Sequence, residues 1–159
     1  MTSIGWLITF CCHGNWLPGD RRGYVEHAAG GKTFRAPPNA RLNIWAARQM
    51  SRRPFLLDAH ARAVVHTAIR DQCLHAGWIL HALHVRTNHL HVVLSGTDPP
   101  ARMMNQIKAW ATRRLRAEAL IGADTKPWAR HGSTVPLRTQ ESLTSACHYV
   151  IEGQGQPLE

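Results

Sequence analysis

Residues 78–95 read WILHALHVRTNHLHVVLS, and this stretch decides the fold. It contains two runs rich in aliphatic residues, Trp78 to Val85 and His89 to Ser95, on either side of the polar link Arg86-Thr87-Asn88. Short strand-like runs joined by so tight a link predict two adjacent antiparallel strands. We therefore expect a β-hairpin here, with the other elements arranged around it.

Periodic apolar patterns and helix-end signals place further elements on both sides of the hairpin. An alternating run with Trp6, Ile8 and Phe10 predicts a first strand, and Asp58 and Gly77 are typical N-cap and C-terminal stop residues of a helix. In chain order we expect a strand over 4–12, a helix over 58–76, the two strands, a helix opened by 98–100, a short strand within 128–138 and a helix over 140–152. This order predicts one α+β domain over residues 1–159, with a ferredoxin-like antiparallel sheet, helices on one face and an added C-terminal helix.

The segment from His13 to Pro54 is rich in Gly, Pro and Arg, which predicts a long irregular connection with one helix near Leu42 to Met50. Long loops in small domains are usually functional, and this one could wrap DNA; a disordered insert is the alternative. Its basic residues are Arg21, Arg22, Lys32, Arg35 and Arg41.

The overall charge points to a polyanionic partner. Lys and Arg number 19 against 10 Asp and Glu, so the formal net charge is +9, and arginine predominates. Each phosphate that such a surface neutralises releases counterions and adds affinity, and arginine suits unpaired strands because it also stacks on bases. We expect DNA contacts from the insert and from residues off the apolar stripe of the 98–116 helix: Arg21, Arg22, Lys108, Arg113, Arg114 and Arg116.

Composition excludes other classes of protein. With 44% hydrophobic and 18% charged residues, the chain is typical of a folded domain rather than a disordered one. No apolar run reaches the roughly 20 residues of a membrane span. The four cysteines form no CxxC pair and no export signal is evident, so we expect reduced thiols in a cytoplasmic protein.

His89 and His91 form the sharpest local feature. In a strand, side chains two residues apart leave on the same face, so both imidazoles point together while Leu90 and Val92 point away. Two neighbouring imidazoles could bind a divalent metal, or they could be a half-exposed pair of strand histidines. Other histidines of the first long helix and the second strand are expected to be structural: His66, His75, His81 and His84.

Tyr149 is a candidate nucleophile. It is one of two tyrosines, and on a helical wheel it lies roughly a third of a turn from the apolar stripe centred near Leu143 and Val150. A phenol off the core, on a helix that could pack beside the two histidines, could attack a phosphate with the help of a nearby cation. An interfacial tyrosine that anchors the helix is the alternative.

Three motifs in order resemble the HUH single-tyrosine transposases and their REP-associated tyrosine transposase relatives. The stretches are ITFCCHGNWLPGDRRG (8–23), TNHLHVVL (87–94), and WARHGSTVPLRTQESLTSACHYV (128–150) continuing into IEGQG. The resemblance covers nearly the whole chain and implies a ferredoxin-like fold, in agreement with the element order. The family is named for the His-hydrophobic-His motif, which is His89-Leu90-His91 here.

The resemblance implies a specific chemistry on single-stranded or hairpin DNA. His89 and His91 would bind Mg²⁺ or Mn²⁺, and Tyr149 would attack the phosphate to give a 5′-phosphotyrosine and a free 3′-OH. A second 3′-OH would then reverse the step and join new partners. Several members act as homodimers that exchange the tyrosine helix.

The third metal ligand is open. Members usually supply it as a Gln one helical turn after the tyrosine, where this chain has Gly153. Glu152 lies about 60° from Tyr149 on an ideal helix, whereas Gln154 lies about 140° away unless Gly153 ends the helix. Position favours Glu152 and residue type favours Gln154.

Three other functions would account for part of the sequence. A histidine-triad phosphoesterase would need a third histidine at position 93, which is Val. A non-catalytic module for single-stranded nucleic acid would be expected to present aromatics, and the strand carrying His89 has none. A host-domesticated relative that processes repeated hairpins would share the chemistry and differ only in its biological role.

Overall fold

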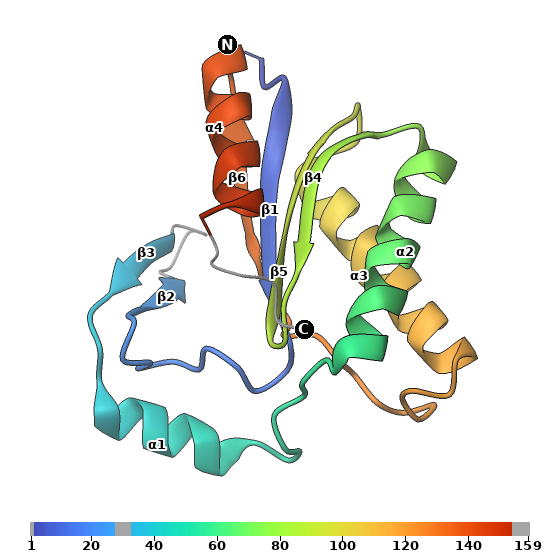
Figure 1. Ribbon diagram of the computed structural model, residues 1–159. Coiled ribbons are helices and arrows are strands. Elements are labelled where there is room, and N and C mark those ends of the chain that lie inside the picture. Colours follow the sequence, from blue (N-terminus) through green and yellow to red (C-terminus); the bar gives the residue numbers. More distant parts are fainter. Residues whose placement is uncertain (1, 28–32, 154–159) are drawn as a thin grey trace.

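A four-stranded sheet forms the centre of the protein (Figure 1). The computed structural model describes residues 2–27 and 33–153, so Lys32 and Gln154 lie outside the described part. The strands are ordered β4 (Ile79–Val85), β5 (His89–Ser95), β1 (Gly5–Cys11) and β6 (Ser133–Leu137). Every neighbouring pair is antiparallel. The strand order and these antiparallel pairings are those of a ferredoxin-like sheet. The predicted fold class is confirmed.

The helices cover both faces of this sheet. Helices α2 (Ala59–Ala76) and α3 (Pro100–Ala117) pack on one face, against a cluster that includes Ile8, Phe10 and Leu90. Helix α4 (Gln140–Ile151) packs on the opposite face, where its apolar stripe contacts Val93. Figure 1 shows α4 on one side of the strands and the α2–α3 layer on the other. The added C-terminal helix thus covers the face that the other two leave open.

Local signals explain where the helices begin and end. The Asp58 side chain accepts a hydrogen bond from the backbone N–H of Ala61, 2.8 Å away, and so caps α2. At the other end, Gly77 has a φ of +71°, the left-handed conformation that glycine adopts without strain. Thr139 and Ser142 form a reciprocal capping box at the start of α4. These ends agree with the sequence prediction to within one or two residues.

The insert is more regular than expected. The predicted helix is present as α1 (Ala40–Gln49), but the prediction of an otherwise irregular connection was wrong. Strands β2 (Tyr24–His27) and β3 (Thr33–Ala36) pair as a small antiparallel hairpin. Strands of four residues are too short to give a clear alternation, and the Gly-rich composition between them favours loop.

Both ends of the insert are fastened to each other. The backbone N–H of Phe55 donates to the carbonyl of His13 at 2.8 Å, and the Asn15 side-chain amide donates to the carbonyl of Phe55 at 2.9 Å. The chain therefore leaves the sheet after β1 and returns to the same place before α2. In Figure 1 the insert lies beside and below the sheet.

Helices capable of crossing a bilayer are absent from the part of the chain that the structure describes.

Candidate functional site

The two motif histidines lie side by side on the sheet face that α4 covers. Their ring centroids are 5.0 Å apart with the planes nearly perpendicular. His91 is 7% exposed, and His89 is half-buried at the start of β5. Across the ladder, Thr9 pairs with His91 and Cys11 pairs with His89, so all four side chains leave on one face.

Each imidazole is held through its Nδ1 atom. Nδ1 of His89 lies 2.6 Å from Oδ1 of Asn88, and because that oxygen only accepts, Nδ1 is the donor. Nδ1 of His91 lies 2.7 Å from the hydroxyl oxygen of Thr9. Histidines that bind a metal through Nε2 are commonly oriented by such partners at Nδ1.

Tyr149 lies next to His91. Their ring centroids are 5.7 Å apart at an interplanar angle of 74°, an edge contact. Tyr149 is 47% exposed, and its ring contacts the ring of the buried histidine. The packing of α4 across the sheet therefore brings the phenol from the end of the chain to the two imidazoles from β5.

His84 holds α4 in this arrangement, a specific role that the sequence alone did not indicate. It pairs with His91 in the β4–β5 ladder and so lies on the same face. Its Nδ1 is 3.1 Å from the backbone carbonyl of Val150, and since a carbonyl only accepts, Nδ1 donates. His84 thus ties the last turn of α4, which carries Tyr149, to the sheet. The register of the hairpin, which places His84 opposite His91, was the one available signal.

Glu152 is bound elsewhere, which corrects the ligand position favoured by helix geometry. Its carboxylate Oε2 lies 2.9 Å from Nε2 of His148, and both side chains are exposed. His148 lies in the last turn of α4 and Glu152 is the C-cap residue four positions later, a spacing at which side chains meet. Within residues 2–27 and 33–153, no group of three or more His, Cys, Asp or Glu is placed to hold a metal.

Gly153 has a close neighbour in Tyr149. Its N–H donates to the Tyr149 carbonyl at 3.0 Å. A Cβ on Gly153 would lie 2.8 Å from that carbonyl oxygen and 3.0 Å from the tyrosine ring. A side chain at this position would push on the candidate nucleophile, so glycine here is compatible with the observed placement of the phenol.

Arg22 is an oriented cation in the insert that follows β1. Its guanidinium forks onto Asp20 at 2.7 and 2.9 Å and lies 4.7 Å above the ring of Trp16. Burial raises the pKa of the Cys11 thiol, and the positive charge of Arg22 opposes this. Since Cys11 is opposite His89, Arg22 acts electrostatically close to the paired histidines. Arg21 is exposed beside it.

Lys108 does not belong to a DNA-binding surface, contrary to the sequence prediction. It is buried, and its ammonium donates to three backbone carbonyls, of Ala129 at 3.0 Å, His131 at 3.2 Å and Arg130 at 3.5 Å. Burial lowers its pKa. The segment 129–131 crosses this flank of α3, which is why a position off the apolar stripe is not exposed.

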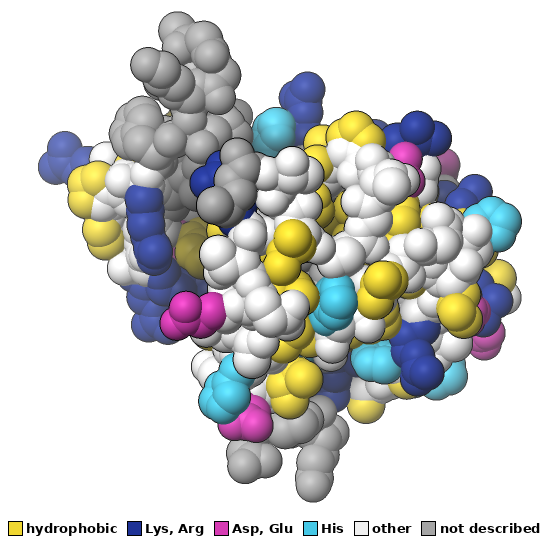
Figure 2. Space-filling view, turned by 90° about the horizontal axis from the view of Figure 1, so that it is seen from above, with side chains coloured by type: hydrophobic (Ala, Val, Ile, Leu, Met, Phe, Trp, Pro, Cys, Tyr) yellow, Lys and Arg dark blue, Asp and Glu magenta, His cyan; other side chains and the backbone are white. Residues whose placement is uncertain are grey.

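The exposed arginines of α3 are remote from Tyr149. Arg113 lies 4.8 Å above the Trp110 ring, Arg114 is 3.5 Å from the Asp71 carboxylate, and Arg116 donates to the carbonyl of Thr125 at 3.1 Å. They belong to the helical layer behind the sheet. Figure 2 shows dark-blue Lys and Arg side chains toward the two sides of the molecule, while the middle of this view is mostly uncharged.

Comparisons with known proteins support the fold. No protein-family model matches the chain, and no curated protein sequence does. Among solved structures it is similar to a REP-associated tyrosine transposase bound to a REP hairpin, with a TM-score of 0.50 and 11% sequence identity. The match covers 94% of this chain but 66% of that one, so the chain spans less than two thirds of its neighbour. For the fold, the resemblance noted from the motifs is confirmed.

Proposed function

We propose that this protein cuts and rejoins single-stranded DNA through a covalent 5′-phosphotyrosine at Tyr149. The observation that carries the proposal is the contact between the half-exposed Tyr149 ring and the buried ring of His91, 5.7 Å apart between centroids. A nucleophile and candidate metal ligands from distant parts of the chain share one face of the sheet. The shared fold with a tyrosine transposase supports the same conclusion.

His89 and His91 fit a divalent metal site, for which Mg²⁺ or Mn²⁺ is the proposed occupant. Both rings are hydrogen-bonded at Nδ1, so Nε2 is the atom through which each would bind a metal. Gln154, just after α4, is the proposed third ligand, because Glu152 binds His148. A cation bound here would polarise the scissile phosphate and stabilise charge on the departing 3′ oxygen.

The residues of the chain supply the remaining steps. The Tyr149 phenol loses its proton and its oxygen attacks phosphorus, so that a tyrosyl phosphate ester forms. The bond from phosphorus to the 3′ oxygen breaks, and that oxygen takes up one proton to give a free 3′-OH. Attack by a second 3′-OH reverses these changes, so the bond energy is conserved and strands are exchanged. His84 holds the turn of α4 from which Tyr149 would attack, and Arg22 is the proposed cation for an approaching phosphate.

The preferred substrate is DNA that contains a hairpin. The structural neighbour is bound to a REP hairpin, and the net charge of +9 suits a polyanion. A mobile-element enzyme and a host hairpin-processing nuclease would use the same site.

A covalent adduct assay tests the proposal. A labelled hairpin with single-stranded flanks is incubated with the protein and Mg²⁺ or Mn²⁺, and adducts are resolved on a denaturing gel. Tyr149→Phe should abolish the adduct. Tyr24→Phe, which changes the second of the two tyrosines, is the matched control and should retain it. An adduct in Tyr149→Phe would show that another residue is the nucleophile.

A non-catalytic DNA-binding module gives a different result in this assay. It would shift the hairpin on a native gel and form no adduct with either metal.

A further inference from the structure

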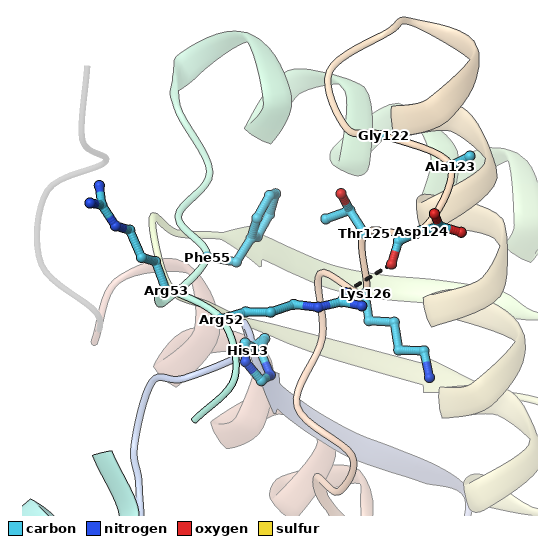
Figure 3. A pocket seen from close by; sticks show the side chains of 9 residues that line it. All are labelled: His13, Arg52, Arg53, Phe55, Gly122, Ala123, Asp124, Thr125 and Lys126. Carbon is cyan, nitrogen blue, oxygen red and sulfur yellow. Dashed lines mark hydrogen bonds between the residues drawn. The ribbon is translucent and has the colours of Figure 1, made fainter. Parts of the chain in front are cut away.

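A pocket of about 480 Å³ lies where the insert rejoins the core. His13, Arg52, Arg53 and Phe55 line it from one side, and the turn of residues 122–126 lines it from the other. Figure 3 shows the Phe55 ring facing that turn across the pocket, with the Arg52 side chain extended between them and Arg53 pointing away. The volume is within the usual range for small-molecule sites, roughly 300–1,000 Å³.

The lining is cationic on one part and apolar on another. Arg52, Arg53 and Lys126 outnumber the single carboxylate of Asp124. Nη1 of Arg52 donates to the backbone carbonyl of Asp124 at 2.8 Å, which holds the guanidinium across the pocket. The half-buried Phe55 supplies a flat apolar face. This combination suits a ligand that has both an anionic group and an aromatic ring.

His13 adds a polar group in need of a partner. Its Nε2 is buried and makes no hydrogen bond among the residues that the structure describes. A buried polar atom without a partner destabilises the folded state, so this ring nitrogen has a cost at the wall of the pocket. Both backbone groups of His13 are already bonded, to Pro127 and Phe55, so the ring is held in place.

The pocket is close to the candidate active site. His13 follows Cys11 by two residues, so their Cα atoms are at most about 7 Å apart, and Cys11 pairs with His89. The backbone of Cys12 donates to Asn88, the residue that holds His89. A DNA strand bound at His89 and Tyr149 therefore needs to extend only a short way to reach the pocket.

We propose that this pocket binds one unpaired nucleotide of the DNA strand, with its base stacked on Phe55 and its phosphate near Arg52 and Lys126. The inference rests on the proposed function for its substrate class. The pocket would fix which nucleotide lies a set distance from the scissile phosphate, and so position the strand for cleavage.

Site-specific fluorescence tests this binding. Hairpin oligonucleotides carry 2-aminopurine at one unpaired position at a time, and emission is recorded as the full-length protein is added. One position should respond far more strongly than its neighbours. Phe55→Leu keeps apolar volume but removes the ring, so the response at that position should disappear and Kd should rise about tenfold. Trp45→Leu, an exposed aromatic on α1, is the control and should change neither.

A second pair of variants tests the cationic part. Lys126→Gln should weaken binding of the same oligonucleotide and reduce the salt dependence of Kd by the amount expected for about one phosphate contact. Arg102→Gln changes an exposed arginine on α3 and is the control, which should alter neither quantity. The proposal that the pocket binds a nucleotide would be refuted by equal fluorescence responses at all positions. It would also be refuted if Phe55→Leu left both the response and the Kd unchanged.

The outcome is separable from the proposed function. Adduct formation at saturating DNA reports on Tyr149, whereas 2-aminopurine emission and Kd report on the pocket without any cleavage. One combination of results would separate the two proposals. If the wild-type protein gives a position-specific fluorescence response that Phe55→Leu loses, but forms no adduct, the nucleotide pocket is supported and the nuclease function is refuted.

Discussion

Tyr149, His91 and Thr9 form a chain of contacts from solvent to the sheet interior. The phenol ring touches the imidazole of His91, and the Nδ1 atom of His91 is bonded to the hydroxyl of Thr9. His91 is almost completely buried, and the hydrogen bond between its Nδ1 and the Thr9 hydroxyl helps to fix how its ring is turned. Threonine at this position is therefore a positioning residue for the proposed metal site.

Thr9→Val should weaken metal activation without loss of the fold. Valine has the same shape but cannot bond Nδ1, and loss of such an outer partner typically lowers metal affinity about 10- to 100-fold. The Mn²⁺ concentration that gives half-maximal adduct formation should rise accordingly. Thr134→Val, on β6 opposite Ile8, is the control and should leave it unchanged. An unaltered Mn²⁺ requirement in Thr9→Val would argue against His91 as a ligand.

Asp20 provides a prediction about pH. Hydrogen bonds from Arg22 hold the pKa of the Asp20 carboxyl below its usual 3.8, so the carboxylate is favoured in the folded state. A depressed pKa means that the stabilisation is present above pH 3.8 and is lost as pH falls through the lower, folded-state pKa. Asp20→Asn should thus lower the unfolding free energy by at most about 1 kcal/mol near pH 6.

The measurement is thermal unfolding of both proteins between pH 2.5 and 7 at one salt concentration. The difference in Tm between wild type and Asp20→Asn should shrink toward acid pH and vanish where Asp20 is protonated. A difference that stays constant with pH would mean that the ion pair with Arg22 is not its source.

At the scale of whole elements, α3 and the segment before β6 are joined by one buried cation. The buried ammonium of Lys108 donates hydrogen bonds to three backbone carbonyls of residues 129–131, which take the place of water. This segment leads into β6, the edge strand next to β1, so Lys108 links the helical layer to the edge of the sheet. The side chain is structural because each donor already has an acceptor.

Lys108→Met should therefore reduce stability and leave DNA recognition nearly intact. Methionine fills similar space but leaves buried carbonyls without a donor, at a cost of about 1–3 kcal/mol. Denaturant unfolding should show this loss, while the salt dependence of hairpin binding at a temperature where the variant is folded should match that of wild type. A reduced salt slope with unchanged stability would restore Lys108 to the DNA-binding surface.

Across the whole molecule, positive charge is divided between two sides of the sheet. Arg21 and Arg22 belong to the insert near the proposed site, whereas Arg113, Arg114 and Arg116 lie on the α3 layer. A single strand cleaved at Tyr149 must pass over the α4 face. The insert arginines are therefore expected to contribute more to binding than those of α3.

Salt titrations of hairpin affinity test this division of charge. The logarithm of the binding constant should fall steeply with the logarithm of salt concentration, with a slope of about −0.7 for each phosphate of a single strand that is neutralised. The double substitution Arg21→Gln with Arg22→Gln should flatten the slope by about 1.4. Arg113→Gln with Arg114→Gln should flatten it less. A flat response in wild type would exclude a nucleic-acid partner.

Much of the fold could be predicted from sequence because its signals are local. The β4–β5 hairpin follows from two aliphatic runs and a short link, and the ends of α2 follow from Asp58 and Gly77. The β2–β3 hairpin was missed because four-residue strands in a Gly-rich segment carry no measurable period. Lys108 was misplaced because a helical wheel includes no residues from other segments.

By itself, the sequence determined that His89 and His91 share a face, since a strand alternates sides with a period of two. It also determined that Tyr149 lies off the apolar stripe of its helix, since the helical repeat fixes that angle. Only the tertiary structure decided that α4 packs on the face with the histidines, that His84 fastens it there, and that Glu152 pairs with His148 instead. Those outcomes depend on contacts between segments far apart in the chain, which no local period encodes.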